Sequence, residues 1–142
     1  MDVHFGIRHL ALRVAHVDRA ATFYEQGLGM RRFTSQDRGH MAVMTSPGAR
    51  DILTLSEPEV PTEIEGIPIG RPGEMGGVDH LGFEVQDHLA VKQVADRCIA
   101  AGGTFVGAVE MVPGFPSVFL RDRDGYLLQL YGLAPHLRAM FG

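Results

Sequence analysis

The stretch GIRHLALRV at residues 6–14 returns 71 positions later as GVDHLGFEV at residues 77–85, with a histidine at the same place in each copy. A second match, at an offset of 75 positions, aligns residues 44–55 with residues 119–130. A repeat of about half the chain is too long for a solenoid unit. We therefore expect two copies of one module, related by a pseudo-twofold axis, whose equivalent residues converge on a shared centre.

The first module is expected to contain a strand, a helix and three further strands. Apolar and polar residues alternate over residues 7–14, which predicts a strand with His9 on the face opposite its leucines. Asp18 is a candidate N-cap for the helix, and Gly27 and Gly29 are expected to stop it. The later strands are expected at residues 30–36, 40–45 and 51–56.

The second module repeats this order. Strand periodicity puts His80 on the face opposite Leu81, and Gln129 and Tyr131 on the face opposite their leucine neighbours. A hairpin turn is expected at residues 122–125, with Gly125 where a positive φ is needed. The expected strands are residues 78–85, 104–109, 117–121 and 126–131, and the expected helix is residues 88–101.

The chain has the length of one domain, and we predict a single domain over residues 1–142. The segment between the modules is rich in proline and glycine, a composition that resists a helix and a central strand. The predicted parts are module one (1–57), a connector (58–76), module two (77–132) and a C-terminal tail (133–142).

The composition favours a small-molecule partner. The 142 residues carry a formal net charge of −4 and no cluster of basic residues, which argues against nucleic acid and against an anionic membrane surface. No apolar run approaches the roughly 20 residues that cross a bilayer, and the first residues do not have the pattern of a signal peptide. We predict a cytoplasmic protein. Cys98, the single cysteine, is expected to pack inside a helix.

Four polar residues are expected to face whatever the sheets enclose. The offset of 75 pairs Thr54 with Gln129, and the other two are His9 and His80. Two neutral imidazoles and an amide oxygen can hold a divalent first-row metal ion, with water or substrate completing the coordination. The sequence therefore predicts a metal site at His9, His80 and Gln129.

Other residues are candidates for lining the same pocket. Tyr131 lies two residues beyond Gln129 on the same face, so it either lines the pocket or donates a proton as a catalytic residue. His40 begins a strand and is expected either in the pocket or at the surface. Phe119 is expected in the pocket lining or the core. The predicted pocket residues are thus Thr54, Tyr131, His40 and Phe119.

Three motifs in this order resemble the vicinal oxygen chelate superfamily, which contains glyoxalase I, methylmalonyl-CoA epimerase, extradiol dioxygenases, fosfomycin resistance enzymes and bleomycin resistance proteins. The resemblance covers nearly the whole chain. The motifs are RHLALRV leading into ATFYEQGLGM (residues 8–14 and 21–30), VDHLGFEV (78–85) and FLRDRDGYLLQL (119–130). It implies an α+β fold in which two βαβββ modules form a cupped mixed β-sheet around a divalent metal ion, and it implies a homodimer.

The resemblance also implies that metal ligands come from the first and last strands of each module. His9 and His80 match such positions, and Gln129 stands where the family often has Glu and sometimes Gln. Thr54 departs from the pattern. A neutral amide in place of a carboxylate argues against an iron dioxygenase. Neither Thr54 nor Gln129 can act as the carboxylate base of a glyoxalase or an epimerase.

Two hypotheses about function follow. In the first, the protein is a metal-dependent enzyme whose Fe, Mn, Ni or Zn ion acts as a Lewis acid on a small substrate that chelates it through adjacent oxygens. A lyase, an isomerase and a dioxygenase all fit this description. In the second, the protein sequesters a small molecule without metal, as bleomycin resistance proteins do. Thr54 and Gln129 both favour the second hypothesis.

Overall fold

The computed structural model describes residues 6–58, 60, 63–64, 67–68, 80–110 and 112–141. The chain divides into two compact units, residues 1–70 and residues 71–142. The division falls inside the predicted connector. No helix in the described ranges combines the length and apolar character needed to cross a bilayer.

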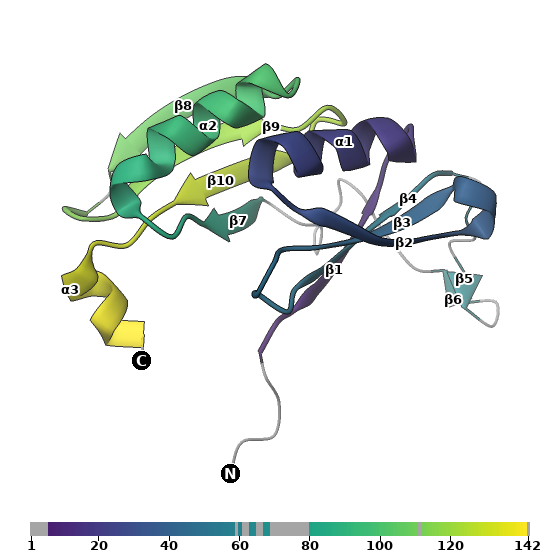
Figure 1. The fold of residues 1–142 in the computed structure, drawn as a ribbon, viewed down its shortest axis with the longest axis horizontal. Helices are drawn as coiled ribbons and strands as arrows, with labels where there is room; N and C mark the ends of the chain where they lie inside the picture. Colours follow the sequence, from purple (N-terminus) through teal and green to yellow (C-terminus); the bar gives the residue numbers. More distant parts are fainter. Residues whose placement is uncertain are drawn as a thin grey trace, which may run out of the picture. The chain divides into compact units, whose positions relative to one another are not determined.

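The first unit is a four-stranded mixed sheet with one helix (Figure 1). The strand order is β1-β4-β3-β2, in which β1 and β4 run parallel and the other pairs run antiparallel. Helix α1 packs on β2, β3 and β4. The elements are β1 (His9–Arg13), α1 (Val17–Leu28), β2 (Arg31–Gln36), the 3₁₀ turn η1 (Asp37–Gly39), β3 (Met41–Thr45) and β4 (Ile52–Ser56).

Alternation along the strands builds the core of this unit. Leu53 and Leu55 of β4 are buried, as are Ala42 and Met44 of β3, because each pair lies on one face of its strand. Helix α1 covers that face with Phe23 and Tyr24, Val17 and two alanines, all of them buried. The rings of Phe23 and Tyr24 meet edge to face, with centroids 5.0 Å apart. The opposite face of the sheet carries His9 and Thr54.

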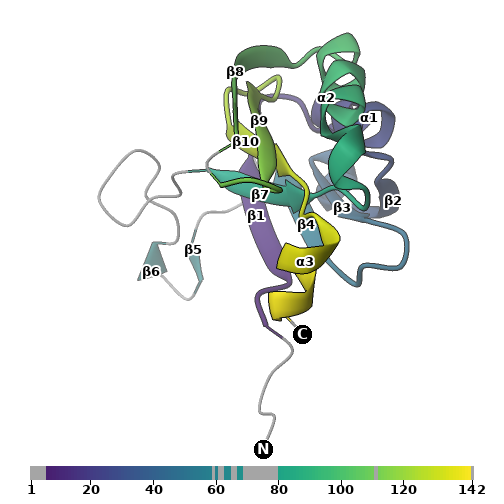
Figure 2. The same cartoon turned by 90° about the vertical axis from the view of Figure 1, so that its left-hand side faces the viewer.

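The second unit repeats this topology. The strand order is β7-β10-β9-β8, again with one parallel pair, β7 and β10. Figure 2 shows α2 alongside these strands and α3 beyond β10, at the end of the chain. The elements are β7 (Leu81–Glu84), the 3₁₀ turn η2 (His88–Ala90), α2 (Val91–Ala100), β8 (Thr104–Glu110), β9 (Pro116–Arg121), β10 (Leu127–Tyr131), α3 (Pro135–Arg138) and the 3₁₀ turn η3 (Ala139–Phe141).

The register of the parallel strands confirms the internal repeat. Ala11 pairs with Thr54 in the first unit, and Gly82 pairs with Gln129 in the second. The two pairs are related by the offsets of 71 and 75 found in the sequence. The α+β class and the two βαβββ modules are thereby confirmed.

The structure corrects the second sequence match, which aligned Met44 with Phe119 and Leu53 with Leu128. Met44 pairs with Leu53 in the first unit, but the residue that pairs with Leu128 in the second unit is Leu120 and not Phe119. The residue equivalent to Met44 is therefore Leu120, and both are fully buried. The reason is the turn before the last strand, which is one residue longer in the first unit. The sequence match contained no gap at this turn, so residues before the turn were aligned one position out of register.

The structure also corrects both ends of the first predicted helix. His16, not Asp18, is the N-cap of α1, and its side chain makes no capping hydrogen bond. Gly27 lies inside the helix and is buried. Gly29 alone takes the left-handed conformation at the end, with φ of 69°. In the hairpin turn Gly125 has the expected positive φ, 92°.

Most of the predicted connector lies outside the described residues. Within it, β5 (Glu63–Ile64) and β6 (Ile67–Pro68) form a two-stranded antiparallel ladder. This short ladder is separate from the two four-stranded sheets, which agrees with a composition that resists a central strand. The single domain and its internal boundaries stay predictions.

Candidate functional site

The first unit offers one imidazole and one hydroxyl on the exposed face of its parallel strands. His9 begins β1, and Thr54 lies on the neighbouring β4. His9 Nε2 lies 3.1 Å from Thr54 Oγ1, within hydrogen-bond distance. Strand alternation places both side chains away from the helix-covered face, as the sequence predicts.

The second unit offers an imidazole and an amide at the equivalent positions. His80 immediately precedes β7, and its Nε2 lies 3.1 Å from Gln129 Oε1. Gln129 Nε2 donates a hydrogen bond of 3.0 Å to Ser117 Oγ, so its amide is held between two partners. The ring of Phe119 meets His80 edge to face, with centroids 5.5 Å apart. Phe119 thus packs beside the histidine, on the same face of the sheet as Gln129.

The two atoms of His80 and Gln129 that could bind a metal ion have a separation that suits such an ion. Two ligands bound to one ion at about 2.1 Å each lie about 3.0 to 3.4 Å apart when they subtend about 90° to 109°. The separation of His80 Nε2 and Gln129 Oε1, 3.1 Å, falls in this range. The first pair has a similar separation, but a neutral hydroxyl is a weaker ligand than an amide oxygen or an imidazole. His80 and Gln129 therefore fit a divalent ion better than His9 and Thr54.

Both pairs lack a carboxylate. Across the described ranges, no group of three or more His, Cys, Asp or Glu side chains is placed to hold a metal ion. Each pair lies within its own unit, and the convergence of His9 and His80 on one centre stays a prediction.

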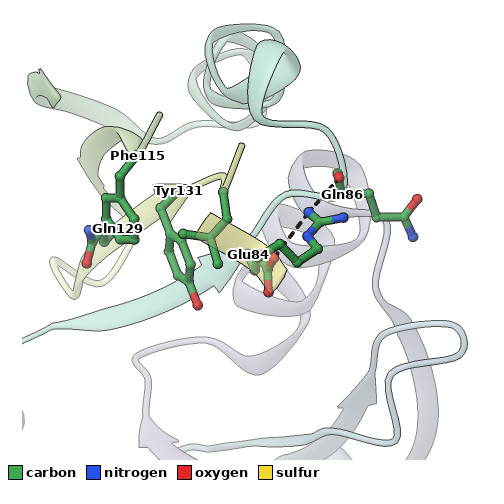
Figure 3. A pocket seen from close by; sticks show the side chains of 7 residues that line it. Glu84, Gln86, Phe115, Gln129 and Tyr131 are labelled. Atoms are coloured by element: carbon green, nitrogen blue, oxygen red, sulfur yellow. Dashed lines mark hydrogen bonds and ion pairs between the residues drawn. The ribbon is translucent and has the colours of Figure 1, made fainter. Parts of the chain in front are cut away.

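A pocket of about 770 Å³ lies beside Gln129 in the second unit. In Figure 3 the side chains of Gln129, Tyr131 and Glu84 follow one another along its wall. Gln129 and Tyr131 are residues that the sequence analysis singled out. The described residues that line the pocket are Glu84, Gln86, Phe115, Gln129, Tyr131, Leu133 and Arg138.

Sequence reasoning missed the charged pair in this pocket. Glu84 Oε1 of β7 lies 3.2 Å from Arg138 Nη2 of α3, and the same nitrogen donates a 2.8 Å hydrogen bond to the carbonyl of Gln86. The two charged residues are more than fifty positions apart, and the tail gives no pattern beyond a short helix. The signal that was present is the position of Glu84, which shares a strand face with His80.

Tyr131 has an environment that keeps its hydroxyl protonated. Partial burial, and after it the negative charge of Glu84, raises the pKa of Tyr131 above its ordinary value. Gly82 makes room for the ring, since a Cβ at this position would lie 3.2 Å from Tyr131 Cε1. Tyr131 is therefore a hydrogen-bond donor on the pocket wall.

His40 has a different set of contacts from the pocket residues. Its Nδ1 lies 3.1 Å from Glu57 Oε1, and Glu57 Oε2 accepts a 2.8 Å hydrogen bond from the backbone N–H of Val17 at the start of α1. The hydrogen bond from Val17, and then that from His40, lowers the pKa of Glu57. These contacts attach the end of β4 to α1. They do not test the prediction that His40 lines the pocket.

Cys98 agrees with the packing role expected for it. The side chain is fully buried in α2. Burial raises the pKa of the Cys98 thiol to about 11, so the reactive thiolate is disfavoured at neutral pH.

One protein family matches this chain over most of its length. The Glyoxalase/Bleomycin resistance protein/Dioxygenase superfamily matches residues 6–130. A search of curated proteins found no match.

Several solved structures share the fold. A glyoxalase-related enzyme from Fulvimarina pelagi is 20% identical, with a TM-score of 0.72 over 91% of this chain and 88% of that chain. Lactoylglutathione lyase from Agrobacterium tumefaciens is 23% identical, with a TM-score of 0.69 over 92% and 96%. A mutant of the fosfomycin resistance protein FosX from Listeria monocytogenes, in complex with Mn(II) and 1S,2S-dihydroxypropylphosphonic acid, is 18% identical, with a TM-score of 0.68 over 96% of both chains.

Proposed function

Because this chain belongs to the Glyoxalase/Bleomycin resistance protein/Dioxygenase superfamily, we propose that it is a metal-dependent enzyme acting on a small molecule with adjacent oxygen atoms. His9, His80 and Gln129 are the proposed ligands of a divalent ion. One observation carries the proposal: each unit places an imidazole Nε2 at 3.1 Å from a side-chain oxygen, at equivalent positions of its parallel strands.

A solved relative supports this choice of ligand chemistry. The FosX structure from Listeria monocytogenes contains Mn(II) and a phosphonate with two neighbouring hydroxyl groups. Lactoylglutathione lyase from Agrobacterium tumefaciens, another relative, is named as a lyase. We propose the same broad class, a lyase, an isomerase or a dioxygenase, for this chain.

The neutral ligand set makes the proposal more specific. Two imidazoles and an amide do not reduce the double positive charge of the ion, which therefore favours an anionic, oxygen-bearing substrate. When bound, the ion supplies Lewis-acid polarisation of a substrate oxygen. Ser117 fixes the amide of Gln129, so that its oxygen faces His80.

Tyr131 is the residue proposed to interact with the reacting oxygen. It lies on the pocket wall in the same strand as Gln129, and its raised pKa keeps the proton on its hydroxyl at neutral pH. It can donate a hydrogen bond from that hydroxyl to a substrate oxygen. Thr54, which occupies the other carboxylate position, binds His9 and provides no base.

A second candidate function is favoured by the same neutral positions. If Thr54 and Gln129 serve only as hydrogen-bonding wall residues, the protein is a metal-free binding protein that sequesters a small molecule. The pocket beside Gln129 is large enough for such a ligand. We propose for either function a cytoplasmic homodimer built from a single two-module domain, which light scattering of the purified protein would test for its oligomeric state.

The metal content of the protein separates the two functions. Untagged wild-type protein is stripped with EDTA, reconstituted separately with Fe(II), Mn(II), Ni(II) or Zn(II), dialysed and analysed for bound metal. His9→Ala and His80→Ala are treated in parallel. His16→Ala is the matched control, because His16 is exposed and its side chain makes no capping hydrogen bond.

The enzyme proposal expects near-stoichiometric metal in the wild type and in His16→Ala, and loss of that metal in both other variants. Wild-type protein that keeps none of the four ions would contradict the metal site. Small-molecule binding without metal would then be the better account.

A further inference from the structure

The pocket of the second unit combines an apolar wall with a positioned cation. Its volume, about 770 Å³, is in the usual range for small-molecule sites, roughly 300 to 1,000 Å³. The described residues that line it all belong to the second unit.

Aromatic rings form part of the apolar wall. The rings of Phe115 and Tyr131 are stacked, with centroids 5.3 Å apart and an angle of 13° between their planes. Leu133 also lines the pocket. A stacked aromatic pair presents flat faces and edges to a ligand, which suits a planar, largely apolar molecule.

Arg138 is held in place with donors to spare. Its Nη2 contacts both Glu84 Oε1 and the carbonyl oxygen of Gln86, as the dashed lines of Figure 3 show. A guanidinium group has five N–H donors in a fixed plane. Within the part of the chain that the structure describes, the N–H groups of Nε and Nη1 have no hydrogen-bond partner. The side chain is about half exposed, so a ligand in the pocket can reach these donors.

We propose that this pocket binds a planar small molecule with an acidic group, and that Arg138 selects this group. A carboxylate or phosphonate can accept hydrogen bonds from Nε or Nη1, which is the geometry that a guanidinium offers to oxyanions. This inference rests on the proposed function, because the pocket adjoins the proposed ligand Gln129. It names the class of ligand that the site takes.

Glu84 is the positioning residue of this arrangement. Together with the Gln86 carbonyl it occupies one nitrogen of Arg138, which fixes the plane of the guanidinium. An acidic group bound at the remaining nitrogens lies closer to Arg138 than to Glu84. Because the Coulomb energy falls with distance, attraction to Arg138 exceeds repulsion by Glu84. The same repulsion disfavours an acidic group at Tyr131, on the other side of Glu84.

The test compares 2-naphthoate with 2-naphthamide, its neutral counterpart of the same shape, by titration calorimetry on EDTA-treated protein. We expect the wild type to bind the naphthoate at least about tenfold more tightly, the size of one charge-assisted hydrogen bond. Arg138→Gln should reduce this preference to less than about twofold. Arg97→Gln is the control, since Arg97 is exposed on α2, outside the pocket, and it should keep the full preference.

Three results would overturn the inference: no binding of either probe, equal binding of both by the wild type, or an undiminished preference in Arg138→Gln. If Arg138→Gln fails to fold by circular dichroism, Arg138→Lys takes its place. A preference below that of the wild type then supports the inference, and an unchanged preference overturns it. The experiment uses no metal, so the naphthoate preference survives if only the metal site is wrong.

Discussion

The two units have the same strand order and the same register, yet they present different chemistry on equivalent positions. Thr54 of the first unit corresponds to Gln129 of the second, and Ala11 corresponds to Gly82. The first unit thus combines a histidine with a weak ligand. The second combines a histidine with a good ligand, beside a pocket. The same backbone frame is therefore kept in both units, while the side chains at equivalent positions on its strands differ.

The segments that follow the last strand extend this comparison. In the first unit Arg13 donates hydrogen bonds of 2.8 Å to the carbonyls of Glu57 and Val60. Its equivalent on β7 is Glu84, which pairs with Arg138 of α3. In both units, therefore, the same position of the first strand holds the segment that follows the last strand. The charge at that position is opposite because its partners are carbonyl oxygens in one unit and a guanidinium in the other.

The largest effect is expected where the chain leaves the last strand. Gly132 is the first residue after β10, and Glu57 is the equivalent residue after β4. A Cβ on Gly132 would lie 2.4 Å from His88 Cα. Since that neighbour is backbone, Gly132→Ala must move the 3₁₀ turn η2, which precedes α2. We expect a loss of about 3 kcal/mol in the free energy of unfolding, measured by urea denaturation.

Glu57→Ala is the matched change in the first unit. It removes a hydrogen bond to the first turn of α1 and should cost only about 1 kcal/mol. Equal losses for the two alanine variants would show that the close approach of Gly132 to His88 is no more costly to disturb than one helix-terminal hydrogen bond.

Glu57→Gln tests the capping contact through its pH dependence. The N–H of Val17 lowers the pKa of Glu57 below its ordinary value of 4.5, with a further contribution from His40. The charged carboxylate therefore stabilises the folded protein above that pH, and this stabilisation is lost as the pH falls through the lowered folded-state pKa. We expect the wild type to be more stable than the variant by about 0.5 to 1 kcal/mol at pH 7.

Urea denaturation at several pH values measures this difference. It should be present at neutral pH and be lost as the pH falls through the lowered pKa of Glu57. A difference that persists in strongly acidic solution, where Glu57 is protonated, would show that its charge does not stabilise α1.

The smallest effect is expected from giving the second unit a residue of the first. Gly82→Ala introduces the side chain found at Ala11, and its Cβ meets the edge of the flexible Tyr131 ring at 3.2 Å. The ring can shift by a few tenths of an ångström, so we expect stability to change by less than about 0.5 kcal/mol. The ring resonances of Tyr131 should nevertheless move in NMR spectra. A loss above about 2 kcal/mol would show that the Tyr131 ring cannot yield.

The sequence was sufficient to predict the two modules because the signals involved are local. Alternation along the strands placed His9 and Thr54 on one face and their leucine neighbours on the other, and burial agrees. The offset of 75 identified Thr54 and Gln129 as equivalent residues, and the strand registers of the two units agree with this. These features depend on residues next to each other in sequence or repeated at a fixed distance.

Contacts between distant segments could not be predicted in the same way. Nothing in the neighbourhood of Arg138 indicates that it reaches Glu84, because that contact depends on how the tail folds back after β10. Likewise, Asp18 has the residue type of an N-cap, but Glu57 reaches the helix terminus from another strand. At the start of α1, therefore, a tertiary contact made by Glu57 takes the place of the local capping preference of Asp18.

The measurement that tests the central claim most directly is the Mn(II) affinity of Gln129→Leu beside that of Thr54→Val. Both variants remove polar side-chain atoms at equivalent strand positions and keep the approximate shape. If the second unit holds the stronger half of the metal site, Gln129→Leu should weaken binding by at least about tenfold. Thr54→Val should weaken it by less than about threefold, the loss of one exposed hydrogen bond. Equal losses, or a larger loss in Thr54→Val, would contradict this account.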